Sequence, residues 1–211
     1  MQYETEEQQV EAMKAWWNEN GKAVILGVVI GAALVAAWMW WKNHQENVAV
    51  AASDNFSNTL EAVQNGDHDK VEVLAKAAKQ EHAGTLYSAY TAMAAARSAI
   101  EQEDLESGAK HLQWVVDNSE LDEVGIIARV RLARVKAAQD DAAGGLNVLP
   151  DTYSDVFTHL IEEVRGDLHV AAGDLVAAKT AYQAAIDSGK AADNDALTMK
   201  INELASVGGN S

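Results

Sequence analysis

Six histidines are the side chains in this sequence best suited to hold a metal ion or to move a proton. They are scattered along the chain, at His44, His68, His82, His111, His159 and His169. No two of them are four residues apart on one helical face, and the chain has no cysteine. A zinc site needs three or four converging ligands, so the sequence predicts no metal site and no cofactor.

Carboxylates and nucleophiles also show no catalytic pattern. Glu162 and Glu163 are adjacent, so on a helix their side chains point about 100° apart and do not form an acid–base pair. There is no G-x-S-x-G nucleophile motif and no glycine-rich phosphate loop after a strand. The sequence therefore predicts a protein that is not an enzyme. An enzyme with an unrecognised site is the weaker alternative.

Residues 23–41 are the first element that the chain must position. They read AVILGVVIGAALVAAWMWW, 19 uncharged residues between Lys22 and Lys42. Such a helix is roughly 28 Å long, close to the hydrocarbon thickness of about 30 Å. Tryptophans at both ends suit the headgroup level. The run is longer than the apolar region of a cleaved signal peptide, so we expect an uncleaved signal anchor that crosses a membrane once.

The lysines around the span predict its orientation. Lys14 and Lys22 precede it, and only Lys42 follows closely, which by the positive-inside rule favours a cytoplasmic N-terminus. The larger C-terminal part would then be periplasmic. We expect a cytoplasmic tail at 1–22, the transmembrane helix at 23–41, a membrane-proximal helix at 42–65, repeats at 66–206 and a C-terminal tail at 207–211. The tail forms either a short helix on the membrane surface or an extension of the span.

The part after the span is strongly acidic. Residues 43–211 contain 13 lysines and arginines against 27 aspartates and glutamates, a net charge of −14. Such a surface repels nucleic acid, so we exclude a nucleic-acid partner. Apolar residues there recur at spacings of three and four, as in Ala178, Ala181, Tyr182 and Ala185. This periodicity predicts an all-α domain.

Acidic or glycine–acidic pairs recur along this domain and mark short turns between helices. They are Gly66-Asp67, Glu103-Asp104, Asp140-Asp141 and Gly173-Asp174, and their second members are 37, 37 and 33 residues apart. Aspartate at such a turn is a good N-cap for the next helix. A small residue, Ala96, Ala133 or Gly166, lies seven residues before each of the last three pairs, where it lets two helices pack closely.

This pattern resembles the tetratricopeptide repeat, a helix–turn–helix unit of about 34 residues. The last unit matches best, with its small, turn and aromatic positions at Gly166, Gly173-Asp174, Ala178 and Tyr182. The middle units depart from it, because Gly108 and Gly145 replace alanine and Leu112 and Leu149 replace the aromatic residue. We expect three helical hairpins with a degenerate fourth. A plain helical bundle is the alternative.

The order of these features is similar to one narrower family, the YfgM-type ancillary subunits of the bacterial Sec translocon. The similarity rests on Glu19-Asn20-Gly21-Lys22, the single span, the repeats, and the segments at 131–135, 165–167 and 199–202. The resemblance implies an inner-membrane protein with its C-terminal domain in the periplasm. It also implies two partners, the Sec translocon and a membrane-anchored periplasmic chaperone of the prolyl-isomerase type.

Stacked hairpins form a solenoid whose first helices line a concave face. When Ala96, Ala133 and Gly166 set the phase of those helices, the residues predicted on that face are Tyr90, Met93, Arg97, Ile127, Val130, Arg134, Leu160 and Glu163. Apolar side chains beside arginines suit an extended or partly folded polypeptide. The alternative is that these residues pack between repeats, with the arginines in ion pairs.

The sequence thus favours a non-catalytic accessory subunit of the translocon that binds proteins and helps pass translocated polypeptides to periplasmic chaperones. A membrane-anchored scaffold or regulatory adaptor for one fixed partner complex, without client binding, is the alternative.

Overall fold

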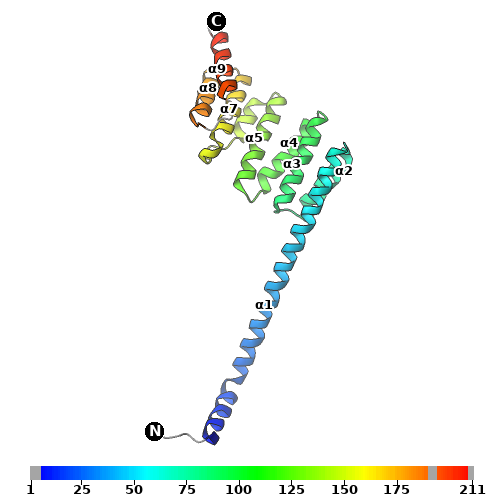
Figure 1. The fold of residues 1–211 in the computed structure, drawn as a ribbon, viewed down its shortest axis with the longest axis vertical. Coiled ribbons are helices and arrows are strands. Elements are labelled where there is room, and N and C mark those ends of the chain that lie inside the picture. Colours follow the sequence, from blue (N-terminus) through cyan, green and yellow to red (C-terminus); the bar gives the residue numbers. More distant parts are fainter. Residues whose placement is uncertain (1–5, 190–193, 209–211) are drawn as a thin grey trace. The chain divides into compact units, whose positions relative to one another are not determined.

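The structure is a computed structural model that describes residues 6–189 and 194–208, and no strand occurs in that part of the chain (Figure 1). The all-α prediction is confirmed there. Contacts divide the chain into two compact units, Met1–Val48 and Ala49–Ser211, called unit 1 and unit 2 below. Residues 1–5 of the predicted cytoplasmic tail and 209–211 of the predicted C-terminal tail lie outside the described residues.

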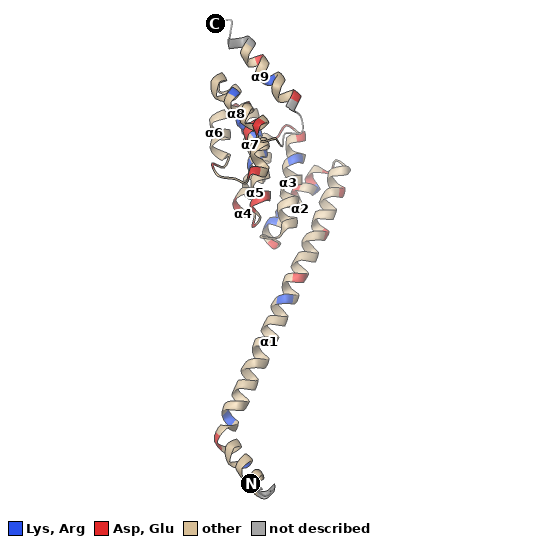
Figure 2. Ribbon diagram, turned by 60° about the vertical axis from the view of Figure 1, so that its left-hand side comes forward, with Lys and Arg blue, Asp and Glu red and all other residues tan. Residues whose placement is uncertain are grey.

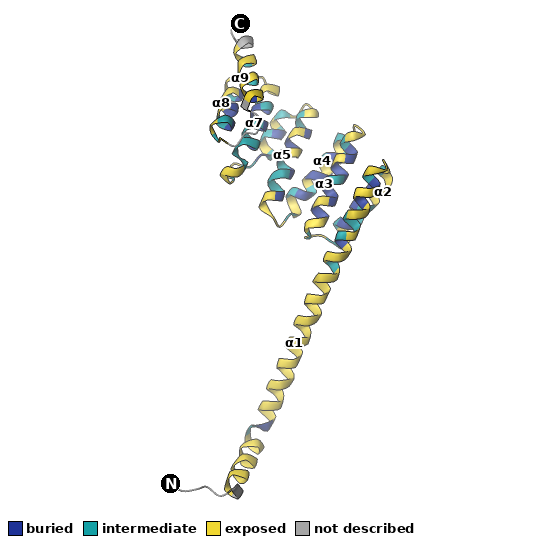
Figure 3. Cartoon of the chain, in the orientation of Figure 1, coloured by how far each residue is buried: buried dark blue, intermediate teal, exposed yellow. Residues whose placement is uncertain are grey.

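Unit 1 is helical throughout its described part, as the first portion of α1 (Glu6–Gln64). The predicted tail and span belong to one helix, so of the two expectations for the tail the structure has the extension of the span. Every residue from 22 to 47 is exposed, as Figure 3 shows in yellow. In Figure 2 the uncharged stretch of α1 is a tan ribbon between two blue bands. Among the described residues, α1 alone is long and apolar enough to cross a membrane.

The C-terminal end of the span carries a belt of aromatic and basic side chains. The Lys42 ammonium lies 5.9 Å from the centroid of the Trp38 ring. The Trp40 ring stacks on His44 at 5.6 Å between centroids. Indole rings beside polar groups fit the headgroup level of a bilayer, where an apolar body and a polar tip are both solvated. An N-terminal transmembrane helix is therefore the first element of this chain.

Unit 2 consists of helical hairpins. The last turns of α1, from Ala49, form the first hairpin with α2, because Ala62 shares a buried cluster with Val71 and Ala75. The remaining elements are α2 (His68–Glu81), α3 (Leu86–Glu101), α4 (Leu105–Asn118), α5 (Asp122–Ala138), α6 (Ala142–Val148), the 3₁₀ turn η1 (Asp155–Phe157), α7 (Thr158–Ala171), α8 (Leu175–Asp187) and α9 (Asn194–Gly208).

The four predicted turns share one backbone conformation. Gly66, Glu103, Asp140 and Gly173 all have φ between 61° and 80°. The next residue donates its N–H to the carbonyl five residues back, as from Asp104 to Ala99, which is the Schellman ending of a helix. The same aspartate then caps the following helix: Asp67, Asp104, Asp141 and Asp174 each accept a backbone N–H three residues on. The predicted N-caps are confirmed, including the one in the weakest repeat.

Helix α5 lies between two buried clusters of unit 2. Its residues Leu132 and Val135 pack with Met93 of α3 and with α4. Its residues Val130 and Ala133 face the other way, toward Ile161, Val164 and Leu168 of α7. These buried positions are the dark blue inner faces in Figure 3. Because α5 buries both sides, its remaining exposed face is narrow, and that face carries the arginines described below.

Candidate protein-binding groove

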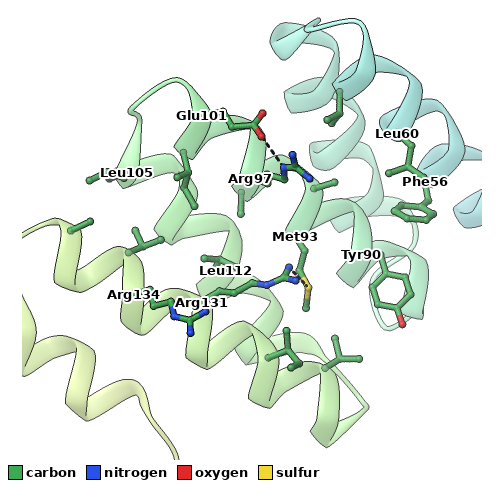
Figure 4. Close-up of a pocket in the computed structure, with 18 of the residues that line it drawn as sticks. Phe56, Leu60, Tyr90, Met93, Arg97, Glu101, Leu105, Leu112, Arg131 and Arg134 are labelled. Carbon is green, nitrogen blue, oxygen red and sulfur yellow. Dashed lines mark hydrogen bonds and ion pairs between the residues drawn. The ribbon is translucent and has the colours of Figure 1, made fainter. Parts of the chain in front are cut away.

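A groove of about 880 Å³ runs along unit 2 between the end of α1, α3, α4 and α5 (Figure 4). Its walls are mainly apolar. The lining side chains are Phe56, Leu60 and Val63 of α1, Tyr90, Met93, Ala94, Ala96, Arg97, Ile100 and Glu101 of α3, Leu105 and Leu112 of α4, and Glu123, Val124, Ile127, Arg131, Arg134, Val135 and Ala138 of α5.

An aromatic cluster forms the α1 side of the groove. The Phe56 ring lies 6.1 Å from Tyr87 and 5.8 Å from Tyr90, between centroids, and both pairs are tilted. Tyr90 is 37 % exposed and Leu60 is 41 % exposed. Exposed aromatic side chains supply large contact areas with little loss of rotamer freedom, which is why they are frequent at protein interfaces.

The α5 side of the groove carries cations. Arg131 and Arg134 are exposed and lie near each other in Figure 4. The Nη1 atom of Arg131 lies 3.4 Å from the sulfur of Met93. Neither arginine makes an ion pair with a described residue. On α3, by contrast, the Nε of Arg97 donates to Glu101 at 2.8 Å, and this pair is open to solvent.

The structure brings together five of the eight residues predicted for the concave face. Tyr90, Met93, Arg97, Ile127 and Arg134 line the groove. The other three lie toward α7 and α9. Val130 is 2 % exposed in the cluster between α5 and α7, and Leu160 packs against the same cluster. Glu163 pairs with Lys200 of α9 at 3.1 Å.

Sequence reasoning missed Arg131, and the spacing contained the signal needed to find it. Arg131 and Arg134 are three residues apart, so on a helix they share a face. Arg131 is also 37 residues after Ala94, which lines the groove from α3. The prediction used only the positions six and three residues before each small residue and one residue after it, and Arg131 lies two residues before Ala133.

A polar cluster in unit 2 joins α2 to α4. The Lys79 ammonium donates to Nδ1 of His111 at 2.7 Å, because an ammonium has no acceptor. The proton of His111 is then on Nε2, which donates to Glu72 at 2.6 Å. Burial lowers the pKa of His111, Lys79 lowers it further, and Glu72 opposes them. Burial likewise lowers the pKa of Lys79. Both ring nitrogens of His111 are thus bonded to α2, so the cluster holds α2 and α4 together.

No group of three or more histidine, cysteine or acidic side chains is placed to hold a metal ion within the described residues. The groove contains no histidine, and its two carboxylates, Glu101 and Glu123, come from different helices. The chemistry that the groove offers is apolar contact together with charge-assisted hydrogen bonds from guanidinium groups.

Known proteins align with nearly the whole chain. An ancillary SecYEG translocon subunit of Escherichia coli is 29 % identical over 204 residues, which cover 96 % of this chain and 98 % of that protein. Proteins of the same description from Haemophilus influenzae and Aggregatibacter actinomycetemcomitans are each 27 % identical over 199 residues, 94 % of this chain and 97 % of theirs. No solved structure matches the chain significantly.

These findings confirm the resemblance that the sequence suggested. The alignments cover nearly the full length of the ancillary subunits, so they include the span of this chain as well as its helical hairpins. A family profile described as tetratricopeptide repeat-like domain matches residues 14–206, which include the span as well as the repeats. The chain therefore belongs to this tetratricopeptide repeat-like family.

Proposed function

We propose that this chain is a single-pass inner-membrane accessory subunit of a SecYEG translocon and that its groove binds polypeptides without catalysing a reaction. The observation that carries the proposal is the alignment of nearly the whole chain with ancillary SecYEG translocon subunits. The tetratricopeptide-like fold supports a non-catalytic role, since such solenoids present extended concave surfaces to protein partners.

The groove supports the polypeptide-binding part of the proposal. Its aromatic side, with Phe56 and Tyr90, offers apolar contact, and its arginines offer directed hydrogen bonds. An extended chain covers roughly 3.3 Å per residue, so a few residues reach from one side to the other across neighbouring helices. In this proposal the bound polypeptide is a translocated chain that is passed on to a membrane-anchored periplasmic chaperone of the prolyl-isomerase type.

The proposed orientation places the N-terminus in the cytoplasm and unit 2 in the periplasm. It rests on Lys14 and Lys22 before the span against Lys42 after it. A reporter enzyme that is active only in the periplasm should be active when fused after Ser211 and inactive when fused before Met1. The reverse activities would overturn the periplasmic location and with it the polypeptide-binding role.

Site-specific photocrosslinking tests the function itself. The full-length protein would carry the photoreactive side chain at Tyr90 in the groove or, as a control, at Val73, which is 67 % exposed on α2 outside it. We expect the Tyr90 position to give many products with secretory polypeptides in cells that are exporting protein, and the Val73 position to give few. Purification of the full-length protein in mild detergent should recover SecYEG.

The outcomes separate the proposal from its alternative. A single discrete product from Tyr90 would favour a scaffold for one fixed partner and contradict client binding. Equal products from Tyr90 and Val73 would remove the groove from the function. Absence of SecYEG from the detergent-purified protein would overturn the role as a translocon subunit.

A further inference from the structure

We propose that Arg131 and Arg134 form a subsite that binds one carboxylate of the polypeptide in the groove. The proposal rests on the proposed function, because it names the chemistry that this groove selects. It concerns which polypeptides bind and not whether the chain belongs to a translocon.

The first support is that Arg131 and Arg134 form no ion pair with a described residue, and Arg131 contacts only the weakly accepting sulfur of Met93. The other three arginines donate to oxygen atoms. Arg97 pairs with Glu101. Arg129 donates to the carbonyl of Val148, and Arg165 donates to Glu162 and to the carbonyl of Pro150. These make up the five arginines of the chain together with Arg131 and Arg134. Among the described residues, the two arginines that donate to no oxygen atom therefore both lie in the groove.

The second support is the charge of the surroundings. Acidic residues outnumber basic ones by 27 to 13 between residues 43 and 211, yet none of the described acids pairs with Arg131 or Arg134. Glu101 is engaged by Arg97. Glu123 lies eight residues before Arg131 on the same helix, about 12 Å along its axis. Two like charges on one helical face repel each other, and an added anion relieves that repulsion.

The third support is the shape of what surrounds the arginines. Met93, Leu112 and Ile127 line the groove beside them. A ligand that satisfies both chemistries is a polypeptide segment with a carboxylate flanked by apolar side chains. Guanidinium groups bind carboxylates through paired N–H groups, which gives direction as well as attraction. A long polyanion such as nucleic acid does not fit, since the surrounding surface is strongly acidic.

Fluorescently labelled synthetic peptides test the subsite on the full-length protein in lipid nanodiscs. Each peptide would be about twelve residues long, roughly 40 Å when extended, with leucine and alanine around one central position. The central residue would be glutamate or glutamine. Each version would have either a free or an amidated C-terminus, because a carboxylate arises from a side chain or from a chain end. The dissociation constants would be measured by fluorescence anisotropy at physiological salt.

We expect the peptides with a carboxylate to bind about tenfold more tightly than the amidated glutamine peptide, since hydrogen bonds to charged groups contribute more than neutral ones. A stronger effect of the central glutamate would assign the subsite to side chains, and a stronger effect of the free end to chain ends. The double variant Arg131→Gln with Arg134→Gln should remove the preference, so that all four peptides bind it with equal affinity. The control variant Arg97→Gln also removes one cation from the groove, and it should keep the preference for peptides with a carboxylate.

Two results would overturn the inference alone. They are equal affinities for all four peptides, or a preference that survives in the double variant. In both cases the groove still binds polypeptides and the proposed function stands. If no peptide binds, or if the variant Tyr90→Glu binds all four peptides as well as the unmodified protein, the groove is not a polypeptide site. That result would contradict the proposed function as well.

Discussion

Hairpin α3–α4 has its glycine on the second helix, whereas hairpin α7–α8 has its glycine on the first. In α3–α4 the helices meet at Ala96 and Gly108, with Leu112 one turn further along. In α7–α8 the equivalent residues are Gly166, Ala178 and Tyr182. The ring of Tyr182 is the reason why glycine and alanine exchange places between the two hairpins. A Cβ on residue 166 would lie 2.3 Å from Cε1 of Tyr182, so the larger ring requires the smallest residue opposite it.

The exchange shows that an interface of fixed spacing constrains total volume more than the identity of any one residue. Hairpin α5–α6 follows α3–α4, with Ala133, Gly145 and Leu149. Its glycine approaches the carbonyl oxygen of Ala133, which a Cβ would meet at 3.0 Å. Substitutions at these glycines should differ in their effect on stability, because a Cβ would meet different atoms at each of them.

Gly166→Ala should have the largest effect, a loss of roughly 2–3 kcal/mol in the free energy of unfolding through overpacking. Tyr182 is 2 % exposed, and its hydroxyl donates to Asp167 at 2.7 Å. The ring therefore cannot move aside without losing that bond. Urea denaturation of the full-length protein in detergent, followed by circular dichroism, measures the change.

Gly125→Ala is the matched control for Gly166→Ala. Gly125 is also inside a helix, α5, but nothing lies within 4 Å of the position of its Cβ. Alanine there should stabilise the protein by up to about 1 kcal/mol, since it is the better helix former. Equal denaturation midpoints for the two variants would contradict the account of the α7–α8 interface. Replacing Gly166, Ala178 and Tyr182 by Ala, Gly and Leu together should recover part of the loss.

Gly145→Ala should have an intermediate effect, of about 1–2 kcal/mol. A Cβ would approach Cδ2 of Leu168 at 2.5 Å as well as the carbonyl of Ala133. Gly108→Ala should cost less, because its nearest atom is Cγ1 of Ile100 at 2.7 Å and the Ala96 carbonyl is further away, at 3.3 Å. Thermal melts of both variants give the order. A larger loss for Gly108→Ala would show that side-chain mobility, and not the backbone carbonyl, sets the cost.

Substitutions in the four turns should change the free energy of unfolding by smaller amounts than substitutions between the helices. Gly66 and Gly173 provide the left-handed residue in two of them, and Glu103 and Asp140 provide it in the others. Residues with a Cβ are strained in that conformation. Glu103→Gly should therefore stabilise the protein by about 0.5–1 kcal/mol, after the entropy cost of glycine in the unfolded chain. Gly173→Ala should destabilise it by a similar amount. Chemical denaturation of both variants measures these changes, and changes of the same sign would contradict this explanation.

The cluster around His111 predicts a dependence on pH. Burial and Lys79 lower the pKa of His111 in the folded state, so the unfolded chain takes up the proton first as the pH falls. The stability that the neutral histidine contributes is present above its unfolded pKa of about 6.5 and is lost as the pH falls below it. Denaturation midpoints between pH 7.5 and about 5.5 should fall more steeply for the unmodified protein than for His111→Gln. Parallel curves would show that carboxylates alone cause the dependence.

The local features of the repeats could be predicted from the sequence, because they depend on residues near one another in the chain. The turn pairs and their N-capping aspartates are examples. The shape of the groove depends on helix lengths and on how hairpins stack. Met93 and Val130 occupy equivalent positions, 37 residues apart. Met93 lines the groove, whereas Val130 is covered by Ile161 and Val164 of α7.

The pairing of charges is predicted only as an alternative in which the arginines form ion pairs, and the structure has such a pair for Arg97 but not for Arg134 among the described residues. Repeat spacing predicts Arg97 and Arg134 on one face, and both residues line the groove. It did not reveal that Glu101, one turn after Arg97, engages that cation, while the chain one turn after Arg134 has alanine at 138. The sequence contains both facts, but which of several nearby acids a flexible side chain contacts is set by small differences in free energy.

The turns at Glu103-Asp104 and Asp140-Asp141 have a bearing on how such a protein can change in length. Each ends one helix and starts the next within two residues, and both do so with the same backbone conformation. The 37 residues from Asp104 to Asp140 therefore form a cassette with compatible ends. If that segment were duplicated in tandem, the end of one copy and the start of the next would together form the same kind of turn. A gene encoding this domain can thus lengthen its groove in one recombination event, and selection then acts on the side chains of a surface that is already folded.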